Sequence, residues 1–152
     1  SMIARSIEKA VQNPNDSNAR GEMLLASLMG AVAFQKGLGI VHATAHPLST
    51  LLDMHHGLAN SMMIPYGMEY NSKGLENKFE QLQKALDTKL AVPDYLHTLK
   101  SKLELPEHLS ELGVEGAHLD DLSELALKDF CLPANPREAD ITDLKKIYKQ
   151  AL

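Results

Sequence analysis

Apolar residues recur three and four positions apart along nearly the whole chain, and this helical period limits the fold more than any other feature. No segment alternates apolar and polar residues between hairpin signals, so strands are not expected. The 152 residues, 44% of them hydrophobic, suffice for one domain with its own core. The sequence therefore predicts an all-α helical bundle, a single domain over residues 3–152. Ser1 and Met2 are interpreted as a tag remnant and a start methionine.

Capping residues, glycines and prolines predict where the helices begin and end. The first strong helix should begin after Asp16, an N-cap residue, and end near Gly37. Its middle, residues 26–33, is rich in small side chains, which predicts close packing as the central helix of the bundle. The later amphipathic helices are expected at 75–86, 93–103, 119–128 and 141–152.

Two further helices are expected at 39–52 and 57–70, and each contains a proline. Pro47 and Pro65 cannot donate a backbone hydrogen bond, and proline disfavours helical geometry in the residue before it. The sequence therefore predicts a kink or break in both helices.

Charge and cysteine content exclude several classes of partner. The net charge of -5 and the scattered Lys and Arg residues give no basic footprint for nucleic acid. The single cysteine, Cys131, cannot form an internal disulfide, so a reduced cytoplasm is the simplest location. The longest apolar stretch, residues 23–34, is too short to span a bilayer. We therefore expect a cytoplasmic protein with no nucleic-acid or membrane partner.

Four of the seven histidines lie between residues 42 and 56. On a helix, His42 and His46 would project from one face, about 6 Å apart along the axis. Neutral imidazole is a common metal ligand, but this spacing alone does not separate a metal site from a satisfied core or surface pair. His56, followed by Gly57 at a helix start, favours the metal site, because glycine permits close backbone approach to an ion.

The predicted metal site is incomplete within this chain. Asp53 is the one carboxylate nearby, and it is assigned to a cap or to solvent. An open catalytic metal would need ligands from elsewhere in the fold. The remaining histidines, His97, His108 and His118, are expected to face solvent, and the methionines to fill the core.

Residues 37–60, GLGIVHATAHPLSTLLDMHHGLAN, resemble the signature of the iron-containing (type III) alcohol dehydrogenases, in which GLG, HxxxHPL and HG occur at these separations. The flanking segments resemble that family too, so the resemblance covers nearly the whole chain. It implies a fold of the dehydroquinate synthase-like superfamily, with an amino-terminal nucleotide-binding domain, a carboxy-terminal helical domain and a metal in the cleft between them. This chain would be the latter part of the helical domain. Residues 37–39 are not a dinucleotide fingerprint, so NAD or NADP would bind through the missing domain.

The resemblance also implies roles for three histidines. His42 and His56 match two of four metal ligands, whereas the other two, in an upstream Asp-x-x-x-His motif, are absent here. His46 matches the histidine that faces the nicotinamide and assists proton transfer, which makes it the expected catalytic and cofactor-binding residue. Ser49 and His55 depart from the family pattern, and His55 is an alternative ligand.

The resemblance implies a metal, a reaction and partners as well. Fe2+ is the expected ion, with zinc or another divalent ion as alternatives, and a small alcohol or aldehyde is the expected substrate. The fragment is expected to be inactive alone, and a homo-oligomer remains open. The rival hypothesis is a freestanding helical interaction or metal-binding module whose Met-rich third helix forms the contact surface.

Overall fold

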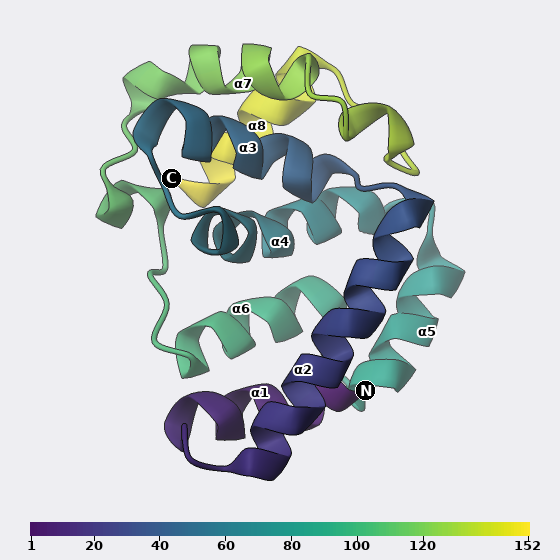
Figure 1. Ribbon diagram of the computed structural model, residues 1–152. Coiled ribbons are helices and arrows are strands. Elements are labelled where there is room, and N and C mark those ends of the chain that lie inside the picture. The colour runs from purple at the N-terminus through teal and green to yellow at the C-terminus, as the bar shows by residue number, and fades with distance from the viewer.

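The computed structural model describes residues 1–152, which form eight α-helices and no strands. This confirms the all-α fold (Figure 1). The helices, in chain order, are α1 (Met2–Gln12), α2 (Ser17–Ala33), α3 (Ile40–Leu52), α4 (His56–Ser72), α5 (Glu76–Leu86), α6 (Val92–Lys102), α7 (Leu119–Leu127) and α8 (Ile141–Ala151). Short 3-10 turns lie at Phe34–Lys36, Leu109–Leu112, Gly116–His118 and Leu132–Ala134.

The hydrophobic core lies where α3 and α4 pack against each other and against α7 and α8 (Figure 1). Its largest fully buried side chains include Tyr148, Ile40, Leu48, Met62, Met63, Leu122, Leu144 and Ile147. The Tyr148 hydroxyl donates a hydrogen bond to the Thr44 carbonyl at 2.7 Å, so the one polar end of this core tyrosine is satisfied. Burial of this kind places α3 at the centre of the packed region.

Both proline-containing helices are continuous, so a break at either proline is wrong. Pro47 lies inside α3 and Pro65 inside α4, and both side chains are buried. A proline inside a helix costs about 3 kcal/mol locally. Packing of both helices on the core outweighs that cost.

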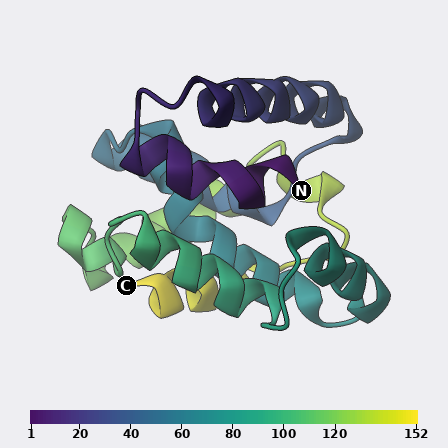
Figure 2. The same cartoon turned by 90° about the horizontal axis from the view of Figure 1, so that it is seen from below.

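Helix α2 is peripheral, which contradicts its predicted central place. Figure 2 shows α1 and α2 as an outer pair on one side of the molecule. Apolar side chains of α2 face solvent, with Leu24 72% and Leu28 62% exposed. A Cβ added at Gly30 would meet nothing within 4 Å. Within this chain α1 is the main partner of α2, and residues 2–12 were not predicted to form a helix.

The other helices begin and end within one or two residues of the expected positions. Asp16 caps α2 as expected, because its carboxylate accepts hydrogen bonds from Asn18 N and Ala19 N, both at 3.0 Å. No single helix is long and apolar enough to cross a membrane. Only α2 with its following turn, taken with α3 across a bend of 103°, reaches that length and apolarity.

Candidate metal centre

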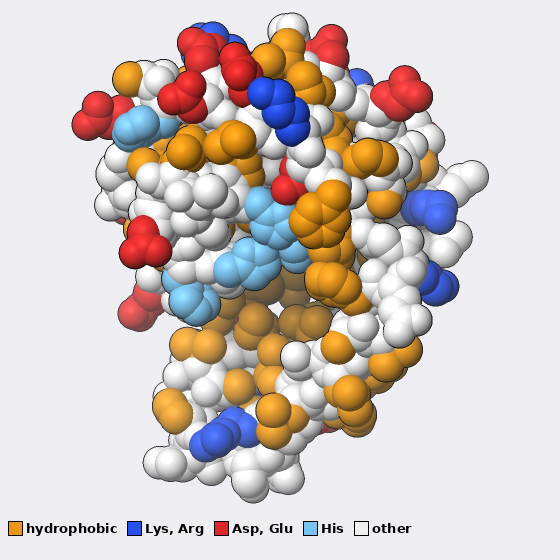
Figure 3. All heavy atoms as spheres, turned by 45° about the horizontal axis from the view of Figure 1, so that its top comes forward, with side chains coloured by type: hydrophobic (Ala, Val, Ile, Leu, Met, Phe, Trp, Pro, Cys, Tyr) orange, Lys and Arg blue, Asp and Glu red, His pale blue; other side chains and the backbone are white.

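Helices α3 and α4 bring three histidines together at one end of their interface. His42 and His46 lie one turn apart on α3, and His56 is the first residue of α4. The ring centroids are 5.8 Å apart for His42 and His46, 5.6 Å for His42 and His56, and 5.3 Å for His46 and His56. Figure 3 shows histidine side chains gathered on one face, above a hollow lined by apolar side chains.

The separation of the His42 and His56 rings agrees with the distance that one shared metal ion requires. Two imidazoles on one ion, with metal–nitrogen bonds of about 2.0–2.1 Å, place their ring centroids about 5 Å apart. The observed 5.6 Å is close to that value, as is the 5.3 Å between His46 and His56. Burial, followed by the charges of His56 and His46, lowers the pKa of His42, which favours the neutral imidazole that binds metals.

Two buried polar atoms without partners lie on the same two helices. Ser49 Oγ is on α3, and Asn60 Oδ1 is on α4, one turn after His56. The Asn60 amide donates to the His56 carbonyl at 3.0 Å and lies 3.1 Å from His56 Nε2. Buried polar atoms of this kind are rare in proteins, and a bound water or ion is one explanation for them. Of the two residues, Asn60 contacts a histidine of the site.

His46 is held by the carboxylate of Asp129, a contact that the sequence analysis did not predict. Its Nδ1 atom lies 2.7 Å from Asp129 Oδ2, and Asp129 Oδ1 accepts a hydrogen bond from the Cys131 backbone N–H at 2.8 Å. Two ligand atoms on one tetrahedral ion with bonds of about 2.0 Å would lie about 3.3 Å apart. The shorter contact is a hydrogen bond, so His46, Asp129 and Cys131 form a network and not a second metal cage.

The Cys131 thiol is free and buried, which is usual for an unpaired cysteine. Burial, together with Asp129, raises the pKa of this thiol to about 11. Without a bound ion the thiol therefore stays protonated near neutral pH.

Two aromatic rings border the histidines. Phe34 meets His42 edge-on, with ring centroids 5.9 Å apart. Phe130 stacks on His46 at 5.6 Å and is 80% exposed. Neither Phe130 nor Asp129 was a predicted site residue, because they follow His46 by more than 80 positions and no spacing rule links them.

The remaining four histidines lie outside the cluster of His42, His46 and His56. His97 is partly buried and meets Tyr66 edge-on at 5.1 Å, so its expected solvent-facing position is wrong. His118 accepts a hydrogen bond from the Glu115 N–H, whereas His55 and His108 are exposed. Asp53 ends α3 in the left-handed conformation, which confirms its assignment as a cap.

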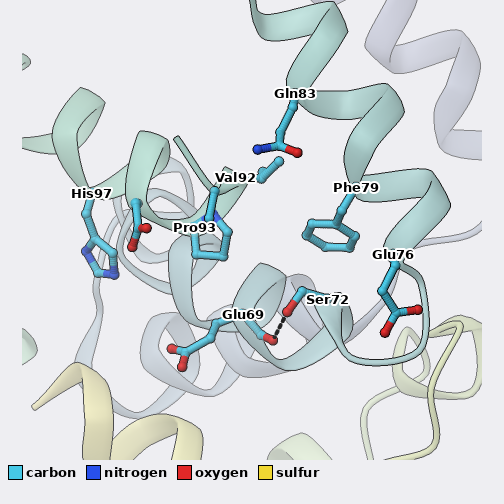
Figure 4. A pocket seen from close by; sticks show the side chains of 10 residues that line it. Glu69, Ser72, Glu76, Phe79, Gln83, Val92, Pro93 and His97 are labelled. Atoms are coloured by element: carbon cyan, nitrogen blue, oxygen red, sulfur yellow. Dashed lines mark hydrogen bonds between the residues drawn. The ribbon is translucent and has the colours of Figure 1, made fainter. Parts of the chain in front are cut away.

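A surface cavity of about 430 Å³ lies between α4, α5 and α6, with His97 in its lining but none of His42, His46 and His56. Figure 4 shows Glu69, Glu76 and Phe79 around it. Glu69 follows His56 by 13 positions on α4, a distance of about 20 Å along a helix axis. The cavity is therefore separate from the site formed by His42, His46 and His56.

Comparison with known proteins agrees with this arrangement. Residues 1–152 match the Fe-containing alcohol dehydrogenase family, C-terminal. The chain is 37% identical to the probable alcohol dehydrogenase EutG of Escherichia coli (strain K12), over 99% of this chain and 39% of that protein. It is 35% identical to the 1,3-propanediol dehydrogenase of Citrobacter freundii, over 99% of this chain and 42% of that protein.

Solved structures give the same result. A crystal structure of 1,3-propanediol oxidoreductase superposes with a TM-score of 0.95 at 31% identity, and the match covers 99% of this chain and 42% of that one. The chain thus spans about two-fifths of the length of its relatives. Sequence and fold lead to one conclusion: this chain belongs to the Fe-containing alcohol dehydrogenase family and corresponds to its C-terminal part.

Proposed function

We propose that this chain is the metal-binding helical part of an alcohol dehydrogenase that interconverts alcohols with aldehydes or ketones. The observation that carries the proposal is the convergence of His42 and His56 from two helices, with ring centroids 5.6 Å apart. Relatives named as alcohol and 1,3-propanediol dehydrogenases support the reaction class.

Two imidazoles leave most positions around a divalent ion open. We propose that the remaining protein ligands and the NAD(P) site lie in residues beyond this chain, since the relatives are more than twice as long. Fe2+ is the ion that the family description favours, although imidazole nitrogens also accept zinc. A bound ion would polarise the alcohol or carbonyl oxygen as a Lewis acid.

The residues of this chain have distinct tasks in that reaction. His42 on α3 and His56 on α4 would hold the ion, and the Asn60 amide, 3.1 Å from His56 Nε2, would orient the His56 ring. His46, anchored through Nδ1, offers Nε2 to the substrate hydroxyl. Phe34 and Phe130 place apolar surface beside the imidazoles of His42 and His46.

Metal titration of this chain tests the ligand assignment. We expect Co2+, a spectroscopic substitute for the resident ion, to bind at one ion per chain. His42→Ala and His56→Ala should each weaken binding at least tenfold, because each removes one of two protein donors. His108→Ala is the matched control, since that imidazole is exposed and far along the chain. Equal affinity in all variants would overturn the assignment, whereas a loss in His55→Ala would assign His55 as a ligand.

Activity measurements test the reaction class separately. We expect no NAD(P)H oxidation with aldehydes by residues 1–152, and turnover by a longer chain that carries a nucleotide-binding domain. Turnover by this chain alone would show that it needs no further ligands. A longer chain that binds metal and NAD(P)H but reduces no aldehyde or ketone would contradict the proposed reaction.

A further inference from the structure

Three consecutive residues after α7 converge on the ring of His46. Asp129 Oδ2 contacts Nδ1 of that ring at 2.7 Å, and the Phe130 ring stacks on its face with an interplanar angle of 24°. The Cys131 N–H donates to the second oxygen of Asp129 at 2.8 Å. The 129–131 segment, as we call these residues, therefore contacts both the edge and the face of one imidazole.

For the neutral His46 ring, the hydrogen-bond inventory determines which nitrogen carries the proton. A carboxylate has no donor, so the nitrogen that faces Asp129 Oδ2 must donate. The side chain of Asp129 is only 10% exposed, and its other oxygen is occupied by the backbone of Cys131. The carboxylate cannot turn away without leaving a buried N–H unpaired.

We propose that Asp129 is a positioning residue that holds His46 in the Nδ1–H tautomer and leaves Nε2 as the acceptor of the ring. The use of Nε2 by a substrate hydroxyl rests on the proposed function. The tautomer itself does not, because it follows from contacts within this chain.

The backbone around both partners is equally constrained. The Asp129 N–H donates to the Ala126 carbonyl at 3.2 Å, and the Leu132 N–H donates to the Asp129 carbonyl at 3.1 Å. On α3, the buried Pro47 follows His46 directly and restricts the local backbone. The ring is thus aimed from both sides before any ligand arrives, which is the preorganisation that a reacting hydroxyl needs.

Asp129→Asn makes a sharp test because it keeps the size of the side chain and changes only its donors. The fixed Cys131 N–H requires the amide oxygen as its acceptor, so the amide nitrogen must face His46 Nδ1. Nδ1 of His46 then has to accept a hydrogen bond from this amide, so the proton of the ring moves to Nε2. We therefore expect the variant to invert the tautomer.

Long-range 1H–15N NMR of the labelled chain, recorded across a range of pH, distinguishes the two neutral tautomers from each other and from the imidazolium form. The His46 signals are those missing from His46→Gln. We expect Nδ1–H in the native chain, Nε2–H in Asp129→Asn, and no change in Asp53→Asn, which removes the same charge from an exposed cap.

Native His46 in the Nε2–H form would overturn the proposal, even if Asp129→Asn fails to fold. A folded Asp129→Asn chain with an unchanged tautomer would overturn it too. The Co2+ titration of the histidine variants tests the proposed function, whereas these spectra test the tautomer of His46. Either proposal can therefore fail while the other holds.

Discussion

Asn135 anchors the start of the helix that carries His42 and His46, so its removal should destabilise the fold. Its Oδ1 accepts hydrogen bonds from the Ile40 N–H at 3.1 Å and from Asn71 Nδ2 at 2.9 Å. Its Nδ2 donates to Asn71 Oδ1 at 2.8 Å and to the Arg137 carbonyl at 2.7 Å. One amide therefore caps α3 and joins it to α4 and to the loop before α8.

The magnitude follows from these four bonds. Each contributes about 0.5–1.5 kcal/mol net, and water can reach part of this half-buried site once the amide is gone. We expect Asn135→Ala to lower the free energy of unfolding by about 2–4 kcal/mol. The fully buried Ile40 would keep an uncapped N–H at the first turn of α3.

Urea unfolding followed by far-UV circular dichroism measures this change. Asn77→Ala is the matched control, because Asn77 is exposed on α5 and alanine favours helix, so its stability should be unchanged or slightly higher. If the two amides act as a pair, Asn71→Ala and Asn135→Ala should not be additive, with a coupling of about 1–2 kcal/mol. A cost below about 0.5 kcal/mol for Asn135→Ala, or strict additivity with Asn71→Ala, would refute this account.

Three shorter predictions follow from packing and protonation. Gly67→Ala should destabilise the chain by about 1–3 kcal/mol in urea unfolding, because its Cβ would lie 2.7 Å from Val41 Cγ2 where α4 crosses α3. An unchanged urea midpoint would contradict that close approach. Leu28→Gln on exposed α2 should change the free energy of unfolding by less than about 0.5 kcal/mol and reduce light scattering by the purified chain. Leu48→Ala, at a fully buried position, should lower the free energy of unfolding by about 2–5 kcal/mol. Equal costs for the two substitutions would show that α2 is covered. Burial lowers the pKa of His97 in the folded chain below its ordinary value of 6.5, so its contribution to stability is present above pH 6.5 and is lost as the pH falls through the folded pKa. His97→Asn should therefore flatten the pH dependence of the unfolding free energy below pH 6.5, and an unchanged slope would argue against this burial.

Much of the fold could be predicted because local rules act within a few residues. Asp16 predicts the start of α2 through its capping oxygen, and the structure places that oxygen on two backbone amides. The prolines show where such rules fail, because a local penalty at Pro47 says nothing of the packing that offsets it. The exposed face of α2 shows the same limit, since small residues indicate that a helix can be packed closely but not which helix packs there.

The candidate site likewise contains residues that local patterns reveal and one residue that only the tertiary structure reveals. His42, His46 and His56 could be found from the sequence, because helical spacing and the resemblance to a family both depend on neighbouring residues. Their roles as ligands and catalytic residue stay predictions, although their convergence agrees with them. Asp129 could not be found in this way, because nothing in its neighbourhood relates it to a histidine 83 residues earlier.

The amino-acid sequence alone determined that this chain is helical, where most helices begin and end, and which imidazoles share a helix face. Periodicity and capping are short-range effects, so they can be read from a single stretch of chain. Only the tertiary structure decided that α3 and α4 stay unbroken, that α2 lies at the edge, and that Asp129 meets His46. These outcomes depend on which surfaces meet after the chain has folded, and that depends on the sum of contacts between residues far apart in sequence.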